Sequence, residues 1–138
     1  MKIGVIIVFG EDNDCIPTDD LINHINDNFE IEFCLVNNMS DIIQDELIQI
    51  CNNCDNANVI FIRRKKSFNF ALRAGTRYLS SISNLNQITY IKAINSEEII
   101  KVMRVLTHSR NEIIAKIIEQ RRTDKVKPTL FQSLLSIS

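Results

Sequence analysis

A run of four basic residues has the clearest chemical use in this sequence. Arg63, Arg64, Lys65 and Lys66 follow an apolar segment and precede Ser67, which can cap a helix beginning after it. Basic side chains in a loop at the end of a strand can bind phosphate groups through their positive charge. The run therefore predicts either a phosphate-binding loop or a solvated turn, and the sequence leaves both open.

The four cysteines offer a second kind of chemistry, metal binding or redox. Cys51 and Cys54 have the spacing of two zinc ligands, but no second Cys or His pair stands at a suitable spacing, and His24 and His108 are isolated. Disulfides are not expected, since the chain shows no secretion signal and has enough apolar residues for a core. We interpret the thiols as small apolar groups packed in that core.

Composition predicts one soluble, cytoplasmic domain. The 138 residues are 45% hydrophobic and carry a formal net charge of -1, which excludes a disordered chain, and the apolar run at the N-terminus is too short to span a bilayer. Residues 1–60 hold one basic and twelve acidic residues, whereas residues 61–138 hold fifteen basic and five acidic ones. This asymmetry indicates a polarised surface. The basic half can attract phosphates, nucleic acid or an anionic membrane, or pair with the acidic half of this chain or of a second subunit.

Apolar runs alternate with amphipathic stretches along the first 108 residues. The predicted strands are residues 2–9, 31–36, 58–62 and 87–92. The predicted helices are residues 18–28, 41–54, 68–83 and 97–108, and a serine that can cap the helix precedes the last three, namely Ser40, Ser67 and Ser96. This alternation predicts an α/β, Rossmann-like fold, in which a mostly parallel sheet has helices on both faces. We expect residues 1–138 to form a single domain.

Two segments near the C-terminus allow more than one interpretation. Residues 111–120 fit either a helical face or a short β-branched strand. Residues 128–137 are amphipathic, and they can pack against the sheet or a second subunit, or dock on a membrane surface. The basic residues interleaved with Phe68 and Phe70 also allow base stacking with a nucleic acid, but Phe70 fits the buried face of helix 68–83.

Open parallel sheets bind ligands at the carboxyl ends of their strands. The loops expected to form a site are therefore residues 9–16, 37–40, 63–67 and 93–96.

These loops carry short motifs in a recognisable order. Phe9-Gly10-Glu11 ends the first strand, Asn37-Asn38-Met39-Ser40 ends the second, and Ala71-Leu72-Arg73-Ala74-Gly75 follows the third. With Arg121-Arg122-Thr123-Asp124, they resemble the first half of a family 2 glycosyltransferase, particularly a polyprenyl-phosphate sugar transferase of GT-A fold. The resemblance implies a nucleotide-diphospho-sugar transferase-like half domain, with Phe9 and Glu11 near the nucleobase and Asn38 where an Asp holds the nucleoside.

The sequence departs from that family at the positions that do chemistry. Ser67 and Asn69 replace two glycines near the diphosphate, Met39 replaces a turn glycine, and Lys92-Ala93-Ile94 replaces the Asp-x-Asp that holds a divalent metal. No acidic residue stands out as a general base. The resemblance then implies no catalytic residue and no metal, and at most weak binding of a nucleotide or nucleotide sugar by these residues: Phe9, Glu11, Asn37, Asn38, Lys66, Arg73 and Lys92.

We therefore expect a catalytically degenerate glycosyltransferase-like domain with a regulatory or structural role. It would act as a homodimer or larger homo-oligomer, or beside a complete glycosyltransferase, because half a fold should expose a sheet edge. One alternative is an active, metal-independent transferase that a partner subunit completes, with Lys92 offsetting the diphosphate charge. Another is a phosphate- or nucleic-acid-binding module that uses the basic half, although no recognised nucleic-acid motif is present.

Overall fold

The computed structural model describes residues 2–82, 85–93 and 95–108, in which four strands and four helices alternate. The strands are β1 (Lys2–Phe9), β2 (Ile31–Asn38), β3 (Ala57–Ile62) and β4 (Leu85–Lys92). The helices are α1 (Thr18–Asp27), α2 (Gln44–Asn53), α3 (Phe68–Ser80) and α4 (Ser96–His108). All eight predicted elements are present to within a few residues of their predicted ends. The predictions for Ile94 and for residues 111–120, 121–124 and 128–137 fall outside the described residues.

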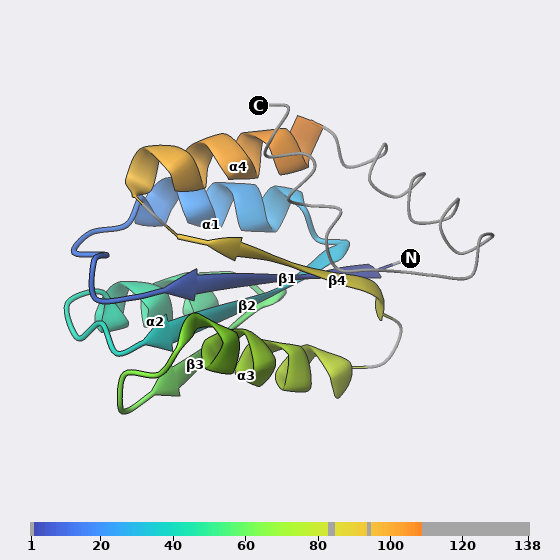
Figure 1. Cartoon of the computed structure of the whole chain (residues 1–138). Coiled ribbons are helices and arrows are strands. Elements are labelled where there is room, and N and C mark those ends of the chain that lie inside the picture. The colour runs from blue at the N-terminus through green and yellow to red at the C-terminus, as the bar shows by residue number, and fades with distance from the viewer. Residues whose placement is uncertain (1, 83–84, 94, 109–138) are drawn as a thin grey trace.

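The strands form one parallel sheet in the order β3-β2-β1-β4 (Figure 1). The chain steps outward from β1 to β3 and then crosses back to place β4 on the other side of β1. Ile7 of β1 is thus paired with both Leu35 of β2 and Ile91 of β4. The reversal between β1 and β4 is a topological switch point, so the Rossmann-like prediction is confirmed.

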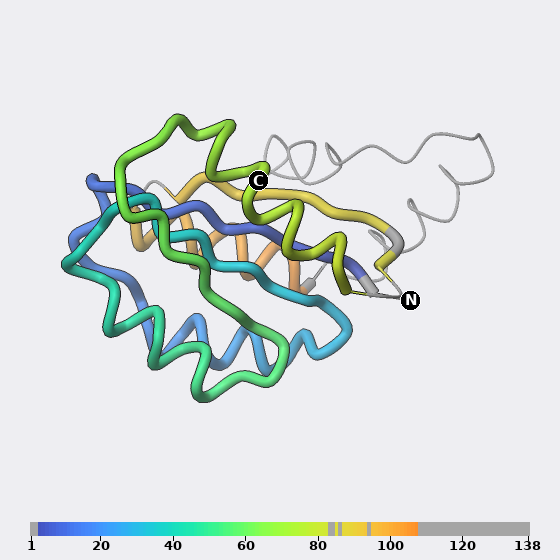
Figure 2. The backbone as a smooth tube through the Cα atoms, turned by 90° about the horizontal axis from the view of Figure 1, so that it is seen from below, coloured from blue at the N-terminus to red at the C-terminus, as the bar shows by residue number. Residues whose placement is uncertain are grey.

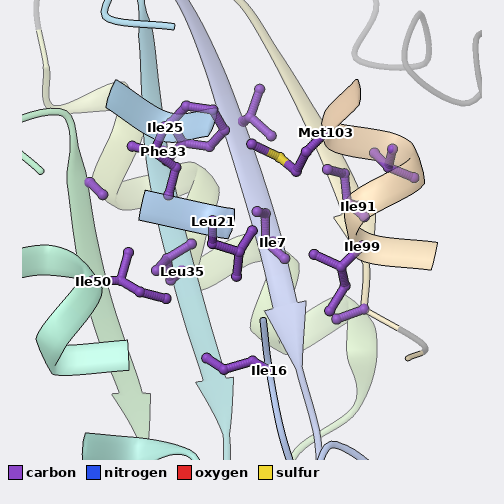
Figure 3. Packing of buried hydrophobic residues seen from close by; sticks show 14 of the residues in the cluster. Ile7, Ile16, Leu21, Ile25, Phe33, Leu35, Ile50, Ile91, Ile99 and Met103 are labelled. Atoms are coloured by element: carbon purple, nitrogen blue, oxygen red, sulfur yellow. The ribbon is translucent and has the colours of Figure 1, made fainter. Parts of the chain in front are cut away.

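Helices cover both faces of this sheet, as predicted. Along β1, alternate side chains face opposite ways, so that Ile7 packs in the core under α1, α2 and α4, while Ile6 packs against α3. Figure 3 shows Ile7 among Leu21 of α1, Ile50 of α2 and Met103 of α4. Right-handed crossovers explain the layers: the step from β3 to β4 runs opposite to the first two steps, so α3 lies on the opposite face.

Helix α3 lies close to β1 because two of the residues on its buried face, Ala71 and Gly75, are small. Ala71, Gly75 and Leu79 are its buried residues, and a Cβ atom on Gly75 would lie 2.8 Å from Cγ2 of Ile6. The prediction that Phe70 belongs to the buried face is wrong, since this side chain is 46% exposed. Phe70 precedes Ala71 by one residue, and that step turns it roughly 100° around the helix, away from the sheet.

Of the three predicted serine caps, only the one at α3 is confirmed. The Ser67 Oγ accepts a hydrogen bond from an N–H of the first turn at 3.1 Å. At α4, the helix begins at Ser96 itself, and the cap is the Oδ1 of Asn95. At α2, the hydroxyl of Ser40 instead donates to the carbonyl of Asn13 at 2.9 Å, and the helix starts one turn later.

Candidate functional site

A cleft of about 320 Å³ opens at the carboxyl edge of the sheet, beside the β1/β4 switch point. Each of the four predicted loops contributes at least one residue to its wall. The lining residues are Val8, Phe9, Gly10, Glu11, Asp12, Asn13, Asn38, Lys65, Lys66, Ser67, Phe68, Lys92 and Ala93. Residues far apart in the sequence thus meet where a parallel sheet of this order binds its ligands.

Two lysines on the wall of the cleft lie over aromatic rings. The Nζ of Lys66 is 5.4 Å from the centroid of the Phe70 ring, and the Nζ of Lys92 is 5.5 Å from that of Phe68. Phe68 in turn packs edge-on against Tyr90, with 5.7 Å between ring centroids. Cation–π contacts of this length hold both ammonium groups near the start of α3. The sequence marked Phe68 only as a possible base-stacking residue, and its contact with Lys92 was not predicted.

The N-terminus of α3 adds hydrogen-bond donors to the same region. Helices α1, α2 and α4 each carry two acidic residues in the first turn, whereas α3 carries none. Within the described part of the chain, the N–H groups of Phe68 and Asn69 meet no acceptor. Because the helix dipole leaves partial positive charge at this end, the start of α3, Lys66 and Lys92 form one positive zone.

The acidic residues of the cleft lie on the loop after β1. The Oε2 of Glu11 is 3.2 Å from the Nζ of Lys65, and both side chains are about half exposed or more. Asp12 also lines this wall. Three lysines against two carboxylates leave the cleft with a small positive excess, which lies on the side of α3 and β4.

Asn38 joins the end of β2 to the loop before α3. Its Nδ2 donates to the carbonyl of Lys66 at 2.8 Å, and its Oδ1 accepts from the N–H of the same residue at 3.0 Å. The side chain is 7% exposed. These two hydrogen bonds position Lys66 in the cleft, a role that the sequence did not indicate, because an Asn at a strand end is typical of ordinary turns.

Three other predicted site residues do not present their side chains to this cleft. Phe9 is 0% exposed and packs in the core below it. Asn37 lies beside a neighbouring hollow, and its carboxamide bonds the backbone N–H and carbonyl of Ser40 at 2.8 and 2.9 Å. Arg73 lies on the exposed side of α3, in a shallow groove with Phe70 and Arg77. The structure therefore brings together Glu11, Asn38, Lys66 and Lys92.

Met39, where the family resemblance has a glycine, keeps the backbone shape of a glycine. Its φ is 65°, and among the described residues it alone has a positive φ. Side chains other than glycine pay roughly 1 kcal/mol or more for this left-handed conformation. The Met39 Sδ accepts the N–H of Lys65 at 3.0 Å, a second link between the two central loops.

The buried cysteines are poor candidates for chemistry. Burial raises the pKa of Cys34 to about 12 and that of Cys51 to about 11, and it also raises the pKa of Cys54. These thiols stay protonated at neutral pH, and a thiol is a weak nucleophile and metal ligand. In the part of the chain that the structure describes, no group of three or more His, Cys, Asp or Glu could hold a metal ion.

Comparison with known proteins assigns no family. No family model matches the chain, and no curated protein or solved structure matches it either. Among the described helices, none is both long and apolar enough to cross a membrane. Any function must therefore be inferred from the cleft and the residues around it.

Proposed function

We propose that this chain is a cytoplasmic, glycosyltransferase-like domain that binds a nucleotide or nucleotide sugar without metal-dependent catalysis. The observation that carries the proposal is the meeting of Lys66, Lys92 and the uncompensated N-terminus of α3 in one cleft at the switch point. Its role would be regulatory or structural, either as a homo-oligomer or beside a complete glycosyltransferase. Self-association is favoured because β3 and β4 are edge strands within the described sheet.

In this proposal the diphosphate lies at the start of α3. The N–H groups of Phe68 and Asn69 donate to phosphate oxygens, and Lys66 and Lys92 offset the negative charge that a divalent metal offsets in related sites. The nucleoside lies along the loop after β1, where the carboxylate of Glu11 can accept a hydrogen bond from a ribose hydroxyl or a base N–H.

We expect no metal-dependent catalysis because of the residues at the end of β4. Lys92 and Ala93 line the cleft where the family resemblance has metal-binding carboxylates. A lysine can offset charge on a leaving diphosphate but cannot hold a divalent cation. An active, metal-independent transferase that a partner completes is the alternative, and turnover of a nucleotide sugar distinguishes it.

The test is calorimetric titration of the full chain with UDP, GDP and their sugar conjugates, with and without Mn²⁺. We expect binding that Mn²⁺ does not strengthen. Lys66→Gln and Lys92→Gln should each weaken it about ten- to a hundredfold, since a charge-assisted hydrogen bond contributes about 1.5–3 kcal/mol. Lys101→Gln on α4, which removes the same charge from the opposite face of the sheet, is the matched control and should change nothing.

Four results would count against this proposal. Failure to bind at millimolar ligand would leave only the fold. Binding that survives both lysine substitutions would place the ligand elsewhere. Stronger binding with Mn²⁺ would contradict our interpretation of Lys92 and Ala93, and turnover would favour the active transferase.

A further inference from the structure

The helix on one face of the sheet carries only positive charge. Between Asp55 and Glu97 the sequence has no acidic residue but seven basic ones, and this stretch forms β3, α3 and β4. Arg73 and Arg77 are exposed on α3 one turn apart, next to the exposed ring of Phe70. Figure 2, seen from the α3 side, shows α3 in front of the strands and α4 behind them. We call Phe70, Arg73 and Arg77 the basic face.

On the opposite side of the sheet, the segments from α1 to α2 carry the complementary charge, whereas α4 on that side has exposed Lys101 and Arg104. No lysine or arginine occurs between Lys2 and Arg63, and α1 and α2 begin with acidic first turns. Ile42, in the segment before α2, is 67% exposed. Asp41 precedes it and Asp45 follows it three residues later, and both aspartates are exposed. We call Asp41, Ile42 and Asp45 the acidic face. Each face thus combines one exposed apolar side chain with two exposed charges, of opposite sign in the two faces.

These two faces lie on different sides of the sheet. The basic face lies on α3, which packs on one side of the sheet, and the acidic face lies at the start of α2, which packs on the other. Charges are screened over about 8 Å at physiological salt. Among the described residues, Arg73 and Arg77 form no ion pair, and neither do Asp41 and Asp45. Arg63 lines the same hollow as Asp41 at the edge of the sheet, but no ion pair joins these two described residues. Both faces therefore keep charges that a partner can neutralise.

We propose that the basic face of one copy of this chain docks on the acidic face of a second copy. The two faces are complementary in charge, because the arginines would lie against the aspartates, and the apolar side chains of Phe70 and Ile42 would also be in contact. A two-fold dimer through α3 would instead set arginines against arginines, because the two faces lie on opposite sides of the sheet. The contact is therefore head-to-tail, and every added copy exposes the same two faces again, so the assembly grows with concentration. This inference does not rest on the proposed nucleotide site.

The test is sedimentation velocity of the full chain over a range of concentrations at low and high salt. We expect association that increases with concentration and weakens with salt. A basic-face variant, Arg73→Gln with Arg77→Gln, and an acidic-face variant, Asp41→Asn with Asp45→Asn, should each weaken association about two- to thirtyfold, because each removes two exposed charge pairs. The α4 variant Lys101→Gln with Arg104→Gln loses the same charge as the first and should associate like the parent chain.

Mixing the two variants makes the test specific. Each retains the face that the other lacks, so an equimolar mixture should form a one-to-one complex that does not grow further. A parent chain that stays monomeric at low salt would overturn the proposal, as would a mixture that forms no complex. A monomeric parent chain that binds a single-stranded oligonucleotide through Arg73 and Arg77 would also overturn it and assign the basic face to nucleic acid.

Discussion

The hydrogen bonds of Asn38 predict that the substitution Asn38→Asp destabilises the protein, although it conserves shape and restores the acid of the family resemblance. The Oδ1 that accepts the N–H of Lys66 is retained, but the Nδ2 that donates to the Lys66 carbonyl becomes an oxygen. Two acceptors would then face each other at about the 2.8 Å of the original hydrogen bond. Neither orientation of the carboxylate avoids this contact.

The magnitude follows from three contributions. Losing the hydrogen bond costs about 1 kcal/mol, and leaving a carbonyl against an acceptor costs about 1–3 kcal/mol. The N-terminus of α3 returns up to about 1 kcal/mol by stabilising the new negative charge. The expected net loss is about 1–4 kcal/mol in the free energy of unfolding at pH 7. Asn38→Ala, which loses both hydrogen bonds without introducing charge, should cost about 2 kcal/mol.

The assay is urea unfolding followed by circular dichroism, because the chain has no tryptophan. A protonated carboxyl group can again donate to the Lys66 carbonyl, so the fold should raise the pKa of the new carboxyl. The deficit relative to the parent chain should then disappear below the unfolded pKa of about 3.9 and return as the pH rises through the folded pKa. An Asn38→Asp protein as stable as the parent at pH 7, or one whose deficit grows on acidification, would refute this reasoning.

Further measurements test the core and the thiols. Gly75→Ala should lower the free energy of unfolding by about 1 kcal/mol, because crowding against Ile6 outweighs the gain in helix propensity. In an Ile6→Ala background the same substitution should raise it by about 1 kcal/mol. A loss of the same size in both backgrounds would exclude the contact with Ile6 as the cause. Met39→Gly should be about 1 kcal/mol more stable than Met39→Ala, against the usual order of these residues, and thermal unfolding of the pair decides it. A thiol reagent at pH 8 should label exposed Cys15 rapidly and buried Cys34 slowly in the folded chain. The free energy of unfolding should also fall from about pH 9 upward, because burial raises the pKa of Cys34 to about 12 in the folded chain, whereas the unfolded thiol ionises near pH 9.

The pattern of residues was sufficient to predict the elements and the edge of the sheet that carries the cleft. Alternating apolar runs and amphipathic stretches depend on neighbours along the chain, so the eight elements could be identified locally. The Ser67 cap and the cations before it likewise follow from adjacent residues. Two local predictions failed. The Ser40 hydroxyl donates to the carbonyl of Asn13 and does not cap α2. The buried face of α3 was predicted one residue too early, so that Phe70 is exposed and not in the core.

The partners of the cleft residues were decided only by the tertiary structure. Alternating strands and helices fit more than one strand order, and the crossover that sets β4 beside β1 brings Lys92 next to the start of α3. The pairing of Asn38 with Lys66 joins residues from two different loops, which no local pattern encodes. The sequence alone therefore determined which segments form the fold and which loops line its edge. Packing across the sheet decided which side chains meet there, because such contacts depend on the relative positions of whole strands and helices.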